Sequence, residues 1–267
     1  STVPGLLAHS NELIKYLKSL NPQEVSSLMS LSDKLGALNY ERFQEWKTPF
    51  TKSNSKQAIL AFKGDVYQGL DAESLSETEL IWAQKHVRIL SGLYGILKPM
   101  DLMQPYRLEM GTKFATKRGQ NLYDFWNSII TEELNKNFSS DNTNLLNLAS
   151  NEYFKSINSS ELKANVITPI FMDRKNGKYK IISFFAKKAR GLMTRYVIKN
   201  QTEDIADIQN FEEGGYFFNE EMSKDVKDAC EPAAPLQVIL KKAKKVVPPP
   251  PPPPPKPEPI KIVKIDN

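Results

Sequence analysis

The sequence predicts an α/β (α+β) protein in which helices surround a mixed central sheet. Three observations lead to this class. Long segments repeat apolar residues at helical spacing, short apolar runs interrupt them, and an Asn-Gly pair at 176–177 separates two further apolar runs. With 267 residues, 40% of them hydrophobic, the chain is long enough to bury a sizeable core.

The elements follow from the N-terminus, each with its own signal. A capping box of Ser76 and Glu79 opens one helix, and Pro22 suits the first position of another. Short apolar runs such as QAILAF and NLLNL predict buried strands. In chain order the sequence predicts helices within 5–47, a strand at 57–62, a helix at 77–90, a glycine turn at 91–95, a helix at 122–137, a strand at 144–148, a hairpin of 165–173 with 178–185, a helix at 186–199 and a last strand at 211–218.

The segment from residue 223 to residue 267 differs in composition from the rest. It holds nine of the 36 basic and five of the 31 acidic residues, which leaves 27 and 26 in residues 1–222. Eight consecutive prolines, Pro248–Pro255, follow the basic stretch Lys241–Lys245, and such a run forms a stiff polyproline II spacer. We therefore expect one domain over 1–222 and a disordered, basic and proline-rich tail over 223–267 outside the core.

Composition disfavours several kinds of site. The single cysteine, Cys230, excludes an intrachain disulfide framework, and together with the distant His9 and His86 it argues against a zinc site. We expect no metal and no cofactor. No apolar run approaches the ~20 residues that a membrane helix needs, and no secretory signal is visible. We expect a cytoplasmic, monomeric protein without a membrane partner.

One segment departs from the even charge balance of the domain. Residues 174–195 contain eight basic residues and no acidic one. The helix expected from residue 186 places cations near its first turn, where the macrodipole disfavours them by about 0.3–1 kcal/mol each and a phosphate would reverse the sign. Its apolar stripe predicts that the cations surround the buried face, although a solvated basic face would explain the run too. We expect the segment to bind a polyanion, most simply double-stranded DNA, through Lys180, Lys187, Lys188, Arg190 and Arg195.

The glycine turn is the second candidate contact with DNA. Its pattern loosely resembles a helix-hairpin-helix, whose hairpin N–H groups grip a DNA phosphate without reading sequence. A helix C-cap followed by a glycine turn explains the same glycines. The residues expected to contact DNA here are Ser91, Gly92, Leu93, Tyr94, Gly95 and Lys98.

An enzymatic site stays open as an alternative. Asp65 and Glu152 come shortly after expected strands, the position where α/β folds place ligands. Arg107 and Glu109 could line the same cleft, although an Arg–Glu pair is more often a structural ion pair. The catalytic candidates for an enzyme acting on a nucleotide or nucleobase are therefore Asp65, Arg107, Glu109 and Glu152.

Six blocks of sequence, in the same order, resemble the YaaA family of peroxide stress proteins. The likeness covers roughly residues 1–222, and its blocks are LSDKL at 31–35, AFKGDVY at 61–67, LSGLYG at 90–95, DLMQPYRLEMG at 101–111, NLASNEYF at 147–154 and ISFFAKKARG at 182–191. The resemblance implies a mixed sheet, a positively charged cleft, and DNA binding with a helix-hairpin-helix at the glycine turn. It also implies survival of hydrogen peroxide by keeping free intracellular iron low.

Two departures from the family pattern affect these expectations. Family members begin with a strand and a Ser-Pro-Ala-Lys-Thr stretch, both of which precede the point matched by Ser1, so we expect an incomplete cleft. From about Val226 the tail stands where the family has a short basic C-terminus.

Overall fold

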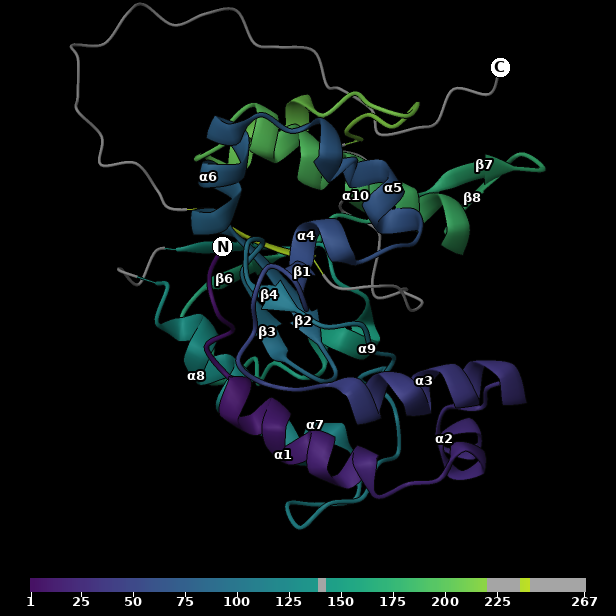
Figure 1. Ribbon diagram of the computed structural model, residues 1–267. Coiled ribbons are helices and arrows are strands. Elements are labelled where there is room, and N and C mark those ends of the chain that lie inside the picture. The colour runs from purple at the N-terminus through teal and green to yellow at the C-terminus, as the bar shows by residue number, and fades with distance from the viewer. Residues whose placement is uncertain (139–142, 220–235, 241–267) are drawn as a thin grey trace, which may run out of the picture.

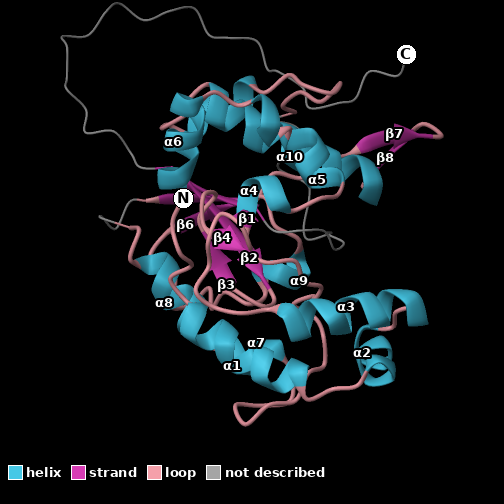
Figure 2. Cartoon of the chain, in the orientation of Figure 1, coloured by secondary structure: helices cyan, strands magenta, loops and turns pink. Residues whose placement is uncertain are grey.

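Helices enclose a small central sheet in the computed structural model, which describes residues 1–138, 143–219 and 236–240 (Figures 1 and 2). The α-helices of this part are α1 (Leu7–Lys18), α2 (Pro22–Met29), α3 (Asp33–Glu45), α4 (Ala58–Ala61), α5 (Asp65–Leu70), α6 (Glu77–His86), α7 (Leu122–Trp126), α8 (Ile129–Asn135), α9 (Asn151–Phe154) and α10 (Ser183–Lys199). Short 3-10 helices occur at η1 (Ala72–Ser74) and η2 (Ile205–Asn210).

The central sheet is mixed, as the sequence predicts. Its five strands lie in the order β3-β2-β9-β5-β6, with β5 and β6 parallel and the other neighbours antiparallel. Two separate ribbons pair β1 with β4 and β7 with β8. The strands are β1 (Lys56–Gln57), β2 (Val87–Ser91), β3 (Gly95–Leu97), β4 (Leu102–Met103), β5 (Asn144–Asn147), β6 (Asn165–Ile167), β7 (Asp173–Lys175), β8 (Lys178–Lys180) and β9 (Leu236–Leu240).

The helices lie on opposite sides of this sheet. Figure 1 shows α1, α7 and α8 on one side and α5, α6 and α10 on the other. The largest fully buried side chains of the core include Trp126, Tyr94, Phe43 and Phe125. Within the described ranges, no helix is both long enough and apolar enough to span a membrane.

The predicted strand at 57–62 is wrong. Only Gln57 belongs to a strand, and the following four residues form helix α4. The N–H groups of Ala58 and Ile59 donate to the carbonyls of Asp101 and Pro99, at 2.8 and 3.0 Å, instead of entering a ladder. A short apolar run suits a buried helical turn as well as a strand, so long-range partners decide between the two.

Three other predicted elements change type or length. The helix expected at 77–90 ends at His86, and the run that follows becomes strand β2. The helix expected at 122–137 divides at Asn127, where φ is 41°. Residues 211–218 turn at Gly214 and Gly215, whose φ angles are 64° and 79°, and do not form the predicted strand.

Strand β9 belongs to the predicted tail but pairs within the central sheet of the domain. The sequence predicts that residues 223–267 stay outside the core, but Leu236–Leu240 forms the central strand of the sheet. The prediction overlooks this segment because the basic and proline-rich stretches around it dominate the composition. The expected structure of the other tail residues lies outside the described part of the chain.

Helix α10 is positioned by a close crossing with α5. A Cβ atom built on Gly69 would lie 2.3 Å from the carbonyl oxygen of Lys188, and one built on Gly191 would lie 1.9 Å from the carbonyl oxygen of Val66. Both distances are far shorter than a carbon–oxygen contact allows, so only glycine lets the two backbones approach this closely. The crossing fixes where the basic N-terminal part of α10 lies.

Candidate nucleic-acid interface

The β7–β8 hairpin carries four exposed cations. Its two-residue turn is Asn176-Gly177, with φ angles of 54° and 76°, so the predicted turn is confirmed. The predicted arms, 165–173 and 178–185, are wrong: residues 165–167 form β6, which pairs with β5, and residues 183–185 begin α10, so the hairpin consists of β7 and β8 alone. Positive φ at both positions matches the type I′ turn that twists two strands together. The cations of the two strands are Arg174, Lys175, Lys178 and Lys180. Figure 1 shows the ribbon projecting away from the body of the protein.

The first turns of α10 continue this surface, because the helix begins three residues after β8. Lys188 is exposed and Lys187 is half-buried. Phe184 and Phe185 are 54% and 38% exposed. The helix starts at Ser183 without a side-chain cap and without an acidic residue in its first turn. Lys187 and Lys188 therefore lie in the second turn, where the macrodipole expected to disfavour them has largely faded.

We call the six cations of the ribbon and of α10 the basic ribbon set: Arg174, Lys175, Lys178, Lys180, Lys187 and Lys188. Within the part of the chain that the structure describes, no carboxylate lies within ion-pair distance of any of them. Asp173, at the base of the ribbon, is buried and accepts a hydrogen bond from the Tyr216 hydroxyl at 2.7 Å. The set is therefore a locally uncompensated positive surface.

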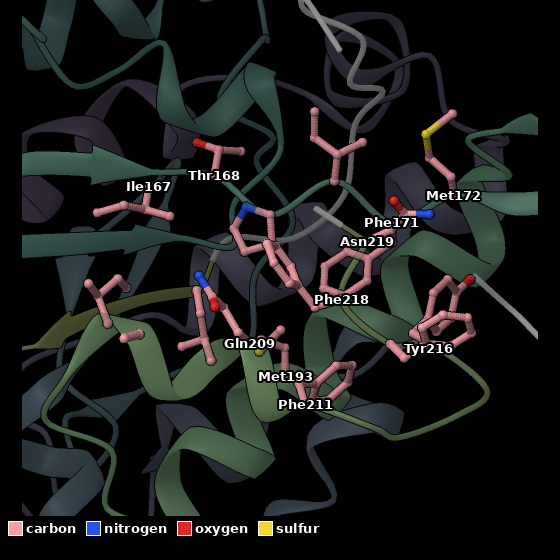
Figure 3. Close-up of a pocket in the computed structure, with 16 residues that line it drawn as sticks. Ile167, Thr168, Phe171, Met172, Met193, Gln209, Phe211, Tyr216, Phe218 and Asn219 are labelled. Atoms are coloured by element: carbon pink, nitrogen blue, oxygen red, sulfur yellow. The ribbon is translucent and has the colours of Figure 1, made fainter. Parts of the chain in front are cut away.

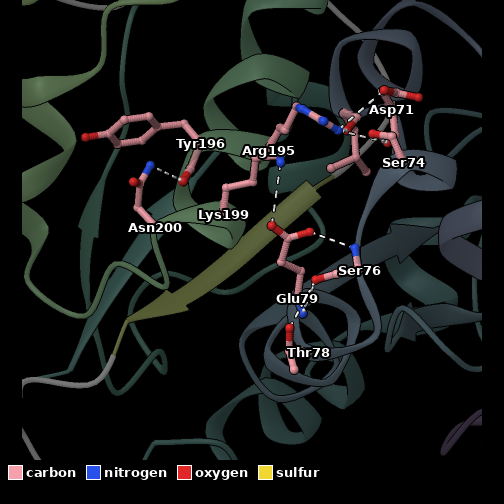
Figure 4. Close-up of polar contacts among 10 residues, drawn as sticks. Asp71, Ser74, Ser76, Thr78, Glu79, Arg195, Tyr196, Lys199 and Asn200 are labelled. Atoms are coloured by element: carbon pink, nitrogen blue, oxygen red, sulfur yellow. Dashed lines mark hydrogen bonds and ion pairs between the residues drawn. The ribbon is translucent and has the colours of Figure 1, made fainter.

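Two residues that the sequence predicts to contact phosphate, Arg190 and Arg195, do not belong to this surface. Arg190 is only 8% exposed, and its Nε donates to the Ala186 carbonyl at 3.3 Å. Arg195 donates to the carbonyls of Leu70 and Asp71 at 3.1 and 2.9 Å and lies 3.5 Å from the Asp71 carboxylate (Figure 4). The expectation that cations only surround the buried face is therefore wrong for Arg190. Arg195 instead satisfies carbonyls at the C-terminal end of α5, as basic side chains often do there.

The glycine turn is not a helix-hairpin-helix. It joins strands β2 and β3, with Ser91 opposite Gly95 in the register. Ser91, Leu93 and Tyr94 are at most 1% exposed, and the Gly92 carbonyl accepts a hydrogen bond from Trp126 Nε1 at 2.9 Å. A Cβ atom on Gly92 would lie 2.3 Å from the Leu108 carbonyl oxygen. Because the turn is buried, a phosphate cannot reach it. Its glycines allow neighbouring segments to pack closely instead.

Lys98 is exposed at the far end of β3. Its N–H donates to the Asp101 carboxylate at 2.8 Å, and Asp101 also accepts from the Thr2 hydroxyl. Burial raises the pKa of Asp101, and these two hydrogen bonds, with the charges of Lys98 and Arg88, oppose the rise. Lys98 thus belongs to a local network around the Thr2–Asp101 bridge.

A helical hairpin does occur elsewhere, at α2 and α3. The helices are joined at residues 30–32, where Ser30 adopts φ 52°, and α3 has no side-chain cap at Ser32. A Cβ atom on Gly36 would lie 1.8 Å from Ser26 Oγ, so the two helices pack closely. The sequence predicts helices within 5–47, but not that two of them form a tight hairpin.

Two of the four catalytic candidates, Glu109 and Glu152, lie near the half-buried Tyr153. Arg107 and Glu109 form an exposed ion pair at 2.9 Å, and Glu152 accepts from the Gly111 N–H at 2.7 Å. Burial raises the pKa of Tyr153, and the charges of Glu152 and Glu109 raise it further. Asp65 begins helix α5, two residues before Tyr67.

Three tyrosines were missed as candidate site residues. Tyr106 shares a 2.5 Å hydrogen bond with Ser91, and burial followed by the neighbouring Tyr153 raises its pKa well above the ordinary value. Burial, followed by Tyr106, raises the pKa of Tyr67 in the same way, and its ring stacks on Phe62 at 5.4 Å. Among the described residues the Tyr67 hydroxyl has no hydrogen-bond partner. The blocks AFKGDVY, PYRLEMG and NEYF each supply one of these tyrosines, which is the signal that could have identified them.

A separate cavity of about 520 Å³ lies beside η2 (Figure 3). Its lining is mainly apolar and includes Phe171, Met193, Phe211 and Tyr216. Arg190 and the basic ribbon set are not part of this lining. The cavity is therefore distinct from the positive surface.

Comparison with known proteins gives a family match over most of the chain. The family model described as "Peroxide stress protein YaaA" matches residues 1–222. A "UPF0246 protein" of Colwellia psychrerythraea is 60% identical over 223 residues, covering 83% of this chain and 87% of the relative. Proteins with the same description from Teredinibacter turnerae and Aliivibrio fischeri are 59% and 56% identical, covering 84% and 82% of this chain and 88% and 85% of the relatives.

Proposed function

Because this chain belongs to the YaaA family of peroxide stress proteins, we propose that it binds double-stranded DNA and protects it during hydrogen peroxide stress. In this proposal its activity also limits free intracellular iron, which lowers the Fenton damage that peroxide causes. The basic ribbon set is the single observation that carries the DNA-binding part. The family match supports the link to peroxide stress.

The shape of the β7–β8 ribbon suits DNA as well as its charge does. A two-stranded β-ribbon fits the major groove of B-DNA, and cations along both strands would then face phosphates on the groove walls. Lys187 and Lys188 extend the contact into α10. Such a surface binds through counterion release, so its affinity depends steeply on salt and only weakly on sequence.

The decisive experiment compares two fourfold alanine variants of the full chain. The first replaces Arg174, Lys175, Lys178 and Lys180, and the matched control replaces the exposed Lys52, Lys56, Lys113 and Lys117, so both lose four charges. Duplex affinity is measured against salt concentration. We expect the first variant to lose at least about tenfold in affinity and about one unit of salt slope per lost phosphate contact. Equal losses in both variants would refute binding through the ribbon.

The experiment also needs a variant that tests the tail, because the stretch Lys241–Lys245 is basic and could bind DNA by itself. A variant with Lys241, Lys242, Lys244 and Lys245 changed to Gln removes that charge while keeping the rest of the chain. If the ribbon is the binding surface, the ribbon substitutions still weaken binding in this background. If all affinity disappears with the tail lysines, the proposal for the ribbon fails.

A second candidate function is an enzyme acting on a nucleotide or nucleobase. The buried Tyr67 hydroxyl, which no described residue satisfies, favours it, since an unpaired donor is costly in a protein interior. Tyr106, Tyr153, Glu109 and Glu152 surround the same region and supply further polar groups. A nucleotide that raises Tm in the native chain but not in Tyr67→Phe, when duplex DNA raises neither, would favour this function.

A further inference from the structure

Phe184 is an aromatic side chain that the fold leaves in solvent. It stands in the first turn of α10 and is 54% exposed, whereas core phenylalanines such as Phe43 and Phe125 are at most 1% exposed. Among the first six residues of α10 only Ala186 is buried, and at about 3.6 residues per turn Phe184 points about 160° away from it. The direction of the helix backbone therefore holds the ring outward.

This ring lies among cations. Lys187 and Lys188 follow Phe184 by three and four residues, and side chains at these spacings are neighbours on a helix, with Cβ atoms about 5–6 Å apart. Lys180, at the end of β8, precedes it by four residues, and Figure 1 shows the ribbon next to this end of α10. All three lysines belong to the basic ribbon set, and residues 174–195 contain no acidic side chain. Phe184 is thus an apolar ring within a surface that attracts polyanions.

A second aromatic ring supports Phe184 from the side. The rings of Phe184 and Phe185 meet at 67°, with their centroids 5.6 Å apart, and Phe185 is the less exposed of the two at 38%. An edge-to-face contact of this kind restricts the rotation of the outer ring. A ring that is already restricted loses less side-chain entropy when a ligand stacks on it.

The chemistry of a phenyl ring decides which form of DNA it can bind. The ring has no hydrogen-bond donor or acceptor, so it neither contacts phosphates nor reads the donor and acceptor pattern of a groove. Bases inside a duplex are stacked on one another, whereas an unpaired base exposes its face, and aromatic rings beside a basic groove hold single strands by stacking on such faces. A protein partner fits this surface poorly, because charged residues are depleted from the core of protein interfaces.

We infer that Phe184 is a base-stacking residue, and that this ring and the basic ribbon set together form a binding site for single-stranded DNA. The phosphates of the strand contact the cations, and an unpaired base stacks on the ring. This site depends on the proposed function, because both use the same cations, and it extends the ligand from duplex DNA to unpaired strands.

Binding of the full chain to a thymidine oligonucleotide of about 12 nucleotides, a length that single-strand sites cover, is the first measurement. Phe184→Ala is compared with Ile81→Ala, which removes an apolar side chain of similar exposure, 52%, from α6. The control position is remote from the ribbon, since Glu79 of α6 contacts Lys199 at the opposite end of α10. We expect Phe184→Ala to lower the affinity at least about fivefold and Ile81→Ala to leave it unchanged. Unchanged affinity in Phe184→Ala would overturn the site.

Two further substitutions separate base stacking from a simple apolar contact. Phe184→Leu keeps an apolar side chain without a ring, whereas Phe184→Tyr keeps the ring. We expect Phe184→Leu to bind the oligonucleotide as weakly as Phe184→Ala, and Phe184→Tyr to bind it as the native chain does. Native affinity in Phe184→Leu would refute stacking. If a matching uridine oligonucleotide binds more tightly than the thymidine one, the ligand is RNA and the assignment to DNA fails.

Tryptophan fluorescence reports the contact directly. Trp46, Trp82 and Trp126 are at most 7% exposed, so none of them can stack on a bound base. In Phe184→Trp, saturation with the oligonucleotide should quench the added emission, whereas in Ile81→Trp it should not. Unquenched emission of Phe184→Trp at saturation would show that no base stacks at this position.

Duplex binding by the same variants distinguishes this site from the function on which it depends. Support requires that Phe184→Ala weakens binding of the oligonucleotide more than binding of a duplex. If the fourfold ribbon variant loses duplex affinity while Phe184→Ala keeps full affinity for the oligonucleotide, the ribbon binds DNA and the stacking site is wrong. If the ribbon substitutions change the affinity for neither ligand, the proposed function fails and the site fails with it.

Discussion

Gly191 of α10 faces the backbone carbonyl of Val66 in α5, and a Cβ atom at position 191 would lie only 1.9 Å from that oxygen. Gly69 makes the reciprocal approach, facing the carbonyl of Lys188. The two helices therefore meet backbone to backbone. This crossing places the basic N-terminal turns of α10 next to the β7–β8 ribbon.

Gly191→Ala should destabilise the protein more than a typical surface change. The obstacle is a backbone carbonyl rather than a flexible side chain, so relief requires the helices to separate, at a cost of about 1–3 kcal/mol. Gly5→Ala is the matched control, because its Cβ would meet only the Glu133 carboxylate at 3.3 Å. Urea unfolding measures both variants. Equal stability of the two would show that the helices separate freely.

Arg195 and Lys188 should differ in what they support. Arg195→Gln removes two hydrogen bonds to the end of α5, so we expect a loss of about 1–3 kcal/mol in unfolding free energy. Lys188→Gln changes an exposed residue and should alter stability by less than about 0.5 kcal/mol. In DNA binding at matched salt, Lys188→Gln should be the weaker binder. The reverse order in either assay would contradict these roles.

Tyr94→Phe should destabilise the β2–β3 hairpin from within the core. The Tyr94 hydroxyl accepts from Trp46 Nε1 at 2.9 Å and from the Gln104 N–H at 3.1 Å. Burial raises the pKa of this hydroxyl to about 12, so it stays protonated at neutral pH. Removing it leaves buried donors unpaired, at about 1–3 kcal/mol. Thermal unfolding of Tyr94→Phe beside Tyr40→Phe, on half-buried Tyr40, measures the difference.

Stability should fall in mild acid because of His9. Partial burial and then the neighbouring Arg118 lower the pKa of His9, and Glu12 opposes them. Arg118 Nη2 lies 3.1 Å from His9 Nδ1, a contact that needs this nitrogen unprotonated. Since the unfolded chain binds the proton more readily, the stability contributed by neutral His9 is present above its ordinary pKa of 6.5 and is lost as pH falls through the lowered folded value.

The measurement is Tm from about pH 8 to about pH 5, the range in which an ordinary histidine titrates. His9→Gln keeps a polar side chain without titration and should show a smaller fall in Tm over that range. If the Tm of His9→Gln falls with pH as steeply as that of the native chain, groups other than His9 cause the loss of stability.

Local signals determined several elements from the sequence alone. Asn176-Gly177 specified the β7–β8 turn, the capping box at Ser76 opened α6, and NLLNL formed β5. These features depend on neighbours a few residues apart, which the sequence displays directly. The excess of cations over 174–195 and the family likeness are also properties of the sequence.

Tertiary structure decided which of those cations face solvent. Arg190 is buried and Arg195 holds the end of α5, because the Gly69–Gly191 crossing draws that face of α10 inward. The glycine turn became a buried β-hairpin because β2 found partners in β3 and β9. Likewise, Leu236–Leu240 became the central strand of the sheet through its pairing with β2 and β5. Burial and strand pairing depend on residues far apart in the chain, and no local pattern contains that information.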